Sequence, residues 1–81
     1  MKKKIAILGS TGSIGKSLIN ILKKDKSNLN ITLLTANENI NELLKQIKIF
    51  KVENIIVTNY KMFLKIKKIL KNKKINIYNN F

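Results

Sequence analysis

Three glycines, Gly9, Gly12 and Gly15, stand at three-residue intervals in the stretch ILGSTGSIG and are the only glycines of the chain. A short apolar run precedes them and an amphipathic run follows, so they lie where a strand would pass into a helix. In such a turn the first glycine allows a sharp bend, the second lets the backbone approach a phosphate, and the third lets the helix pack closely. Free N–H groups at the start of the helix attract an anion. The spacing predicts a dinucleotide-binding turn, with a capped turn that binds nothing as the alternative.

The same stretch does not fit the P-loop of nucleoside triphosphatases. That motif needs a glycine five positions before its Gly-Lys-Ser/Thr ending. Gly15-Lys16-Ser17 resembles the ending, but Ser10 stands at the earlier position. The sequence therefore excludes this motif.

The end of the second expected strand distinguishes NAD from NADP. In NAD-binding folds, a carboxylate about 20 residues past the glycines pairs with the ribose 2′-hydroxyl. Here the sequence reads Leu34-Thr35-Ala36-Asn37, without an acid. A neutral, hydrogen-bonding end tolerates a 2′-phosphate, so NADP(H) is favoured. Glu38 would repel that phosphate unless it faces solvent, and Asn39 is expected to cap the next helix, to contact the cofactor, or to do both.

Alternating apolar periodicities predict an α/β fold around this turn. Strands are expected at 4–8, 31–35, 54–58 and 75–78, helices at 13–24, 39–50 and 60–71, and a turn at 25–30. This β-α-β-α-β-α-(β) order implies a parallel sheet with right-handed crossovers and helices on its faces. We expect the N-terminal part of a Rossmann-type doubly wound parallel sheet. The span 1–81 is then a partial dinucleotide-binding domain, without the catalytic and C-terminal domains.

Helical spacing also predicts which residues face the core. These are Ile14, Leu18, Ile21 and Leu22 in the first helix, Ile40, Leu43, Leu44, Ile47 and Phe50 in the second, and Met62, Phe63, Ile66, Ile69 and Leu70 in the third. At the start of the second helix, Asn39 and Glu42 have the spacing of a capping box, in which each side chain bonds the other residue's backbone N–H.

The composition points to binding and not to chemistry. The chain has no cysteine and no histidine, and its four acids are Asp25, Glu38, Glu42 and Glu53. Such a set offers no convincing zinc site, catalytic triad or carboxylate pair. We therefore expect no catalytic residue and no metal ligand in this chain.

The net charge of +13 raises the possibility of nucleic-acid binding. All 17 basic residues are lysine, whereas arginine is the usual reader of guanine edges and clamp of phosphates. Lysine, asparagine and isoleucine, whose codons are rich in A and T, make up 44 of the 81 residues. Compositional drift explains the lysines without a ligand, so no nucleic-acid partner is expected.

No apolar run reaches the roughly 18 residues of a membrane span. The opening Met1-Lys2-Lys3-Lys4 resembles the start of a signal peptide, but the apolar run behind it ends at Gly9 and lacks a cleavage site. A cytoplasmic protein without a membrane partner is expected. Half a sheet with an uncovered edge also predicts marginal stability or aggregation.

The glycine stretch and the later segment LTANENINELLKQIKIFKVENIIV resemble the N-terminus of the 1-deoxy-D-xylulose 5-phosphate reductoisomerase family. The filled form of the glycine triplet, with Ser-Thr and Ser-Ile between the glycines, is more particular than the triplet itself. Ala36, Asn39, Ile40, Leu43 and Gln46 match the family pattern Ala-x-x-Asn-Val/Ile-x-x-Leu-x-x-Gln. The likeness covers about residues 4–58 and corresponds to roughly the first fifth of such a protein.

This resemblance implies an NADPH-dependent oxidoreductase of non-mevalonate isoprenoid biosynthesis. Family members convert 1-deoxy-D-xylulose 5-phosphate into 2-C-methyl-D-erythritol 4-phosphate, and they use a divalent metal, Mg or Mn. NADPH contacts carried over by position fall on Thr11, Gly12, Ser13, Ile14, Asn37 and Asn39. The metal ligands and the substrate residues lie far beyond position 81, so the chain alone is expected to be inactive. A homodimer is expected only for the full-length enzyme.

Two alternatives remain from the sequence. One is an N-terminal fragment of another NADP-dependent Rossmann enzyme, such as a semialdehyde dehydrogenase or an extended short-chain dehydrogenase. The other is a small basic nucleic-acid-binding module, which would interleave stacking aromatic residues among its lysines.

Overall fold

The computed structural model of the chain describes residues 2–81, which form one sheet with helices packed against it. In chain order the elements are β1 (Lys3–Ile7), α1 (Ser13–Leu22), the 3-10 helix η1 (Lys23–Asn28), β2 (Leu29–Ala36), α2 (Ile40–Ile49), β3 (Val52–Val57), α3 (Tyr60–Ile69) and β4 (Asn76–Tyr78). The sheet order is β1-β2-β3-β4, and each neighbouring pair is parallel. The predicted α/β fold with a parallel sheet is confirmed.

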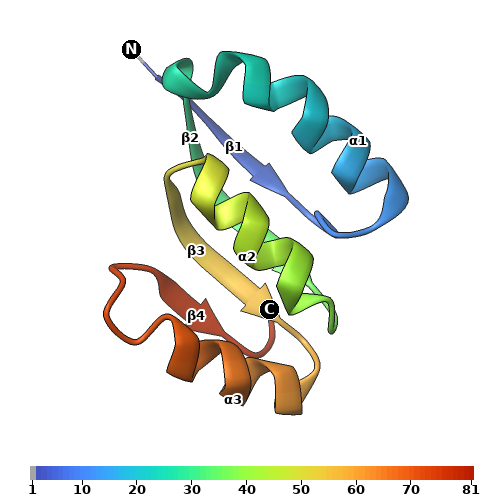
Figure 1. Cartoon of the computed structure of the whole chain (residues 1–81), viewed down its shortest axis with the longest axis vertical. Coiled ribbons are helices and arrows are strands. Elements are labelled where there is room, and N and C mark those ends of the chain that lie inside the picture. The colour runs from blue at the N-terminus through green and yellow to red at the C-terminus, as the bar shows by residue number, and fades with distance from the viewer. Residues whose placement is uncertain (1) are drawn as a thin grey trace.

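Each crossover moves one place along the sheet in the same direction. Because such connections are right-handed, α1, α2 and α3 are expected to follow one another on one face of the sheet. Figure 1 shows α2 in front of β2 and β3, with α1 and α3 on either side of it. A doubly wound sheet also needs a reversal of strand order, and residues 2–81 contain no such reversal.

The core lies between the strands and the helices. The apolar side chains without exposed surface are Ile31, Leu34, Leu43, Ile55, Val57 and Ile66. Burying each of them stabilises the fold by about 1.5–3 kcal/mol relative to exposure. The two central strands supply four of these six side chains. The core therefore holds β2 and β3 in place, and the segments at their carboxyl ends with them.

The predicted boundaries around residues 23–30 were wrong. The first helix ends at Leu22, and η1 occupies most of the expected turn, where Asn28 Nδ2 donates to Asp25 Oδ1 at 2.6 Å. Strand β2 begins at Leu29, two residues before the predicted start, because Leu29 is buried and pairs with Lys3 of β1.

The predicted inward faces of α1 and α3 also need correction. In α1 the buried residues are Gly15 and Ile19, whereas Ile14, Ile21 and Leu18, which were expected to face the core, are 87%, 66% and 38% exposed. Helix α1 has two apolar stripes, and the close approach of Gly15 to the preceding turn selects the stripe that contains Ile19. In α3, Ile69 is exposed although it was expected to face the core.

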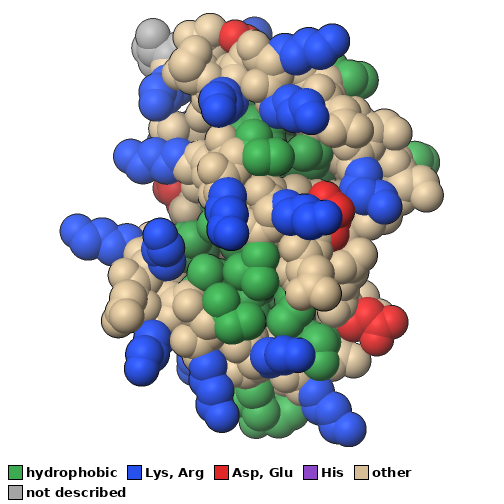
Figure 2. Space-filling model, viewed as in Figure 1, with side chains coloured by type: hydrophobic (Ala, Val, Ile, Leu, Met, Phe, Trp, Pro, Cys, Tyr) green, Lys and Arg blue, Asp and Glu red, His purple; other side chains and the backbone are tan. Residues whose placement is uncertain are grey.

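Every lysine is exposed, and lysines occur in β1, in all three α-helices, in η1 and in the loops. Figure 2 shows them spread over the whole visible face, with apolar atoms between them, and not gathered into one patch. Separately, no helix within residues 2–81 is long and apolar enough to cross a membrane.

Candidate functional site

Three loops meet at one edge of the sheet because parallel strands bring their carboxyl ends together. They are residues 8–12 after β1, 37–39 after β2 and 58–59 after β3. Backbone bonds fix them: Ser10 N–H donates to O of Thr35 in β2 at 2.9 Å, and Asn59 N–H donates to Asn37 O of the neighbouring loop at 2.9 Å. In open α/β sheets, ligands bind at this edge. The structure thus brings together the two segments that the sequence assigns to a nucleotide.

The bend out of β1 depends on Gly9. Its φ of +68° lies in the left-handed region that side chains disfavour. Its N–H donates to Thr35 Oγ1 at 2.7 Å, and its carbonyl accepts from the N–H of Gly12 at 3.1 Å. The predicted role of Gly9 in a sharp turn is therefore confirmed.

Helix α1 begins without a side-chain cap. Its N-cap is Gly12, with extended φ and ψ of −76° and 174° and no side-chain hydrogen bond. The other two α-helices are capped, because Asn39 Oδ1 accepts from the N–H of Glu42 at 3.2 Å and Asn59 Oδ1 accepts from that of Met62 at 3.1 Å. First-turn N–H groups have no acceptor inside the helix. At the glycine turn these donors have no side-chain acceptor, and the positive helix end favours an anion.

Gly12 and Gly15 differ in what a side chain would meet. A Cβ on Gly15 would overlap Gly9 O and lie 2.7 Å from Ser10 Cα, so any side chain would push α1 off the turn. A Cβ on Gly12 would meet only Gly9 O, at an ordinary 3.5 Å. The close-packing role predicted for Gly15 is confirmed. The fold itself does not require glycine at position 12, which leaves that position available for a ligand-related reason.

Three of the four contacts predicted around the start of α1 line a small cavity. Thr11 is half-buried, while Ser13 and Ile14 are exposed. Gly12, Ser13 and Ile14 line a cavity of about 570 Å³ together with the end of β1 and Leu18. This cavity joins backbone donors to an apolar wall, as a nucleotide site requires.

The predicted contacts after β2 lie on the neighbouring loop and are exposed. Asn37 Oδ1 accepts from Thr58 Oγ1 at 2.8 Å, and Asn39 Oδ1 caps α2. Both amides thus use their oxygens as acceptors within the protein. Glu38 is exposed as well.

The capping box predicted at α2 is half right. Asn39 accepts from the backbone of Glu42, but the Glu42 carboxylate accepts from Gln46 Nε2 at 3.3 Å and not from the backbone of Asn39. Gln46 is a residue that the sequence reasoning did not assign to the site. It is fully buried and donates to Ser10 O at 2.8 Å, inside the glycine turn. The sequence does indicate that Gln46 is buried, because it stands at helical spacing between the core residues Leu43 and Phe50.

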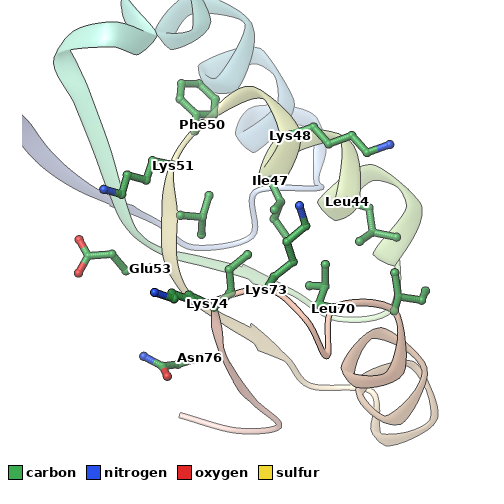
Figure 3. A pocket seen from close by; sticks show the side chains of 13 residues that line it. Leu44, Ile47, Lys48, Phe50, Lys51, Glu53, Leu70, Lys73, Lys74 and Asn76 are labelled. Carbon is green, nitrogen blue, oxygen red and sulfur yellow. The ribbon is translucent and has the colours of Figure 1, made fainter.

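A larger cavity than that at the glycine turn lies elsewhere. It is a groove of about 870 Å³ between α2 and α3, at the amino ends of β3 and β4 (Figure 3). Its wall is mostly apolar, and the side chains of Lys48 and Lys51 extend in opposite directions and do not converge. We favour the glycine turn as the site, because it has aligned backbone donors at the edge where ligands of such sheets bind.

No metal site is formed by the part of the chain that the structure describes. Residues 2–81 contain no group of three or more His, Cys, Asp or Glu side chains that could hold an ion.

Comparison with known families decides the relationship of this chain. The family described as 1-deoxy-D-xylulose 5-phosphate reductoisomerase matches residues 5–80. The chain belongs to this family. This match favours the reductoisomerase over the other NADP-dependent enzymes that the glycine turn allows.

Individual reductoisomerases agree with this assignment. The enzyme of Pelagibacter ubique is 57% identical over 79 residues, which are 98% of this chain and 20% of that protein. The enzyme of Buchnera aphidicola is 44% identical over 73 residues, which are 90% of this chain and 18% of that protein. The chain spans about a fifth of the length of the curated reductoisomerases that it matches.

A solved structure shows the same fold. It is the 1-deoxy-D-xylulose 5-phosphate reductoisomerase of Zymomonas mobilis in complex with NADPH, which is 22% identical in sequence. The TM-score is 0.87, and the match covers 96% of this chain and 21% of that one. The Rossmann-type expectation for this part of the reductoisomerase fold is thereby confirmed.

Proposed function

We propose that the chain is the N-terminal, NADPH-binding part of a 1-deoxy-D-xylulose 5-phosphate reductoisomerase. The complete enzyme would convert 1-deoxy-D-xylulose 5-phosphate into 2-C-methyl-D-erythritol 4-phosphate in non-mevalonate isoprenoid biosynthesis, as a cytoplasmic homodimer with Mg or Mn. Residues 1–81 would form part of the dinucleotide-binding domain. The catalytic and metal-binding groups would lie in other parts of the enzyme, so this chain alone would not turn over substrate.

The observation that carries the proposal is the uncapped start of α1 behind the glycine turn, in a chain of this family. The amides of α1 lack a side-chain partner at the edge of the sheet where a dinucleotide diphosphate would bind. The fit is also steric, because Gly12 is free of close contacts and would let a phosphate approach the backbone.

Each predicted contact has a role in this proposal. The diphosphate would lie against Thr11, Gly12, Ser13 and Ile14, and the 2′-phosphate would lie near Asn37 and Asn39. Because both asparagine oxygens accept bonds within the protein, their NH2 groups would donate to the phosphate. NADPH, when bound, supplies the hydride of the reduction. The residues of this chain bind and orient it.

A chimaera tests the proposal at the level of the enzyme. Residues 1–81 would replace the matching N-terminal fifth of the Pelagibacter ubique reductoisomerase. NADPH oxidation that depends on 1-deoxy-D-xylulose 5-phosphate is the expected result, and the 81-residue chain alone should show none. A folded chimaera that neither binds NADPH nor turns over substrate would refute the proposal.

Replacement of Gly12 by leucine then tests the site within the chimaera. Since the position is open, the fold should be retained, while the side chain would occupy the space of the diphosphate. We expect the Kd for NADPH to rise at least tenfold, about 1.4 kcal/mol. Asn20→Leu on the exposed surface of α1 is the matched control and should leave the Kd unchanged.

A further inference from the structure

Two buried polar side chains hold the glycine turn from beneath. Thr35, at the end of β2, accepts the N–H of Gly9 on its Oγ1 at 2.7 Å and the N–H of Ser10 on its carbonyl at 2.9 Å. Gln46, on α2, donates from Nε2 to Ser10 O at 2.8 Å. The exposed fractions of Thr35 and Gln46 are 5% and 0%. The turn therefore has its backbone fixed on both sides of the peptide that joins Gly9 to Ser10.

Gln46 is used here as a double donor. Its Nε2 faces Ser10 O and Glu42 Oε2, and both of these atoms only accept. The orientation of the amide is thereby fixed, and its Oε1 is one of two buried side-chain atoms without a partner among the described residues. A buried acceptor without a partner lowers stability. Packing alone would favour an apolar residue, so the two N–H groups are what this position requires.

The bond to Ser10 O has a direct consequence for the next amide. In a trans peptide the C=O and the following N–H point in opposite directions. The structure contains no cis peptide within residues 2–81. With Ser10 O held toward α2, the N–H of Thr11 must point away from α2. Thr11 is the first of the residues proposed above to lie against the diphosphate.

We propose that Gln46 and Thr35 are positioning residues of the candidate site, which fix the peptides of Gly9 and Ser10 so that the following amides face the diphosphate. This inference rests on the proposed function, because it concerns the same nucleotide. Gln46 and Thr35 do not touch the ligand. They set the direction of the backbone groups that do.

The same side chains connect the two halves of the site. Gln46 bonds Glu42, and the backbone N–H of Glu42 bonds Asn39 Oδ1. One continuous set of bonds thus runs from Ser10 in the glycine turn to Asn39 beside the expected 2′-phosphate. Helix α2 holds both segments in one relative position, and the diphosphate and the 2′-phosphate would meet a preformed pair of loops.

The test introduces Gln46→Met, which keeps the length of the side chain but removes both donors, into the chimaera described above. NADPH and NADH share the diphosphate, so we expect both Kd values to rise about tenfold with their ratio unchanged. In the ligand-free chimaera, amide hydrogen exchange of Ser10 and Gly12 should accelerate about tenfold relative to amides of β3. Asn41→Met, an exposed amide on the same helix, is the matched control and should change neither measurement.

Thr35 provides a second variant with its own rescue. Thr35→Val removes the acceptor of the Gly9 N–H and should reproduce both effects, the higher Kd values and the faster exchange. Thr35→Ser retains the hydroxyl, so its Kd values and exchange rates should equal those of the unaltered protein. Ile66→Val, on the buried face of α3, is the control that distinguishes a positioning role from a general loss of stability. It should accelerate the exchange of all core amides alike.

Unchanged Kd values in Gln46→Met and Thr35→Val, or exchange that rises uniformly as in Ile66→Val, would overturn the inference. Failure of the unaltered chimaera to bind NADPH would instead count against the proposed function. The exchange measurements need no ligand, so they decide the positioning role even in that case.

Discussion

Gly15→Ala is expected to destabilise the chain even though alanine is the better helix former. Inside a helix, alanine is favoured over glycine by about 0.8–1.0 kcal/mol. At position 15 the new Cβ would overlap Gly9 O and lie 2.7 Å from Ser10 Cα. Overpacking of this kind costs about 1–3 kcal/mol. The upper part of that range applies, because the opposing atoms are backbone atoms fixed by hydrogen bonds to Thr35 and Gln46.

The difference leaves a net loss of about 1–2 kcal/mol in the free energy of unfolding. Urea titration followed by circular dichroism measures it directly. With a slope of about 1 kcal/mol per molar urea, the midpoint should fall by roughly 1–2 M. For a domain of this size, the thermal midpoint should fall by about 4–8 °C for each kcal/mol.

Asn20→Ala is the control for helix propensity. Asn20 lies on the exposed side of the same helix, so replacement by alanine should raise the free energy of unfolding by a few tenths of a kcal/mol, up to about 0.7. The two variants should therefore move the midpoint in opposite directions. If Gly15→Ala moved it upward as Asn20→Ala does, the close contact between α1 and the glycine turn would be refuted.

Three further outcomes are expected. Asn39→Ala removes the cap of α2 and should lower the free energy of unfolding by about 1 kcal/mol in a urea titration. It should also bring the Kd for NADPH closer to that for NADH, because an amide proposed to lie near the 2′-phosphate is lost. Glu38→Lys replaces a repelling charge by an attracting one in the loop proposed to lie near the 2′-phosphate, so it should lower the Kd for NADPH a few-fold but not that for NADH. The gain should shrink as the salt concentration rises. Equal effects on both Kd values would contradict the proposed position of the 2′-phosphate. Leu8→Lys and Ile21→Lys should reduce self-association in light scattering without lowering stability, because both side chains are 66% exposed.

The order of the elements was predictable because each has a strong local period. A short run such as Lys4-Ile-Ala-Ile-Leu8 before a glycine has few alternatives to a buried strand. The start of β2 was not predictable in the same way. Leu29 stands between polar residues, and it joins the strand only because Lys3 of the first strand pairs with it. That pairing depends on the register of a distant segment.

The buried face of α1 could not be predicted from the sequence, for a different reason. Its apolar residues form two stripes, and amphipathicity alone does not choose between the one with Ile14 and Ile21 and the one with Ile19. Gly15 makes the choice, since only its bare backbone can lie against the turn. The glycine motif predicts that the helix packs closely at Gly15, and this contact also determines which side of the helix is buried.

For Gln46, the sequence predicts the burial of the side chain, but only the fold shows its hydrogen-bond partner. Its position on α2 could be derived, because three residues after Leu43 and four before Phe50 is the buried face of a helix. A buried amide must find partners, so the sequence even required a hydrogen bond there. The partner, however, is a backbone carbonyl 36 residues away, and every residue type carries such a carbonyl. A motif describes side chains, so it lists the glycines of the turn and omits the helix that holds the turn in shape.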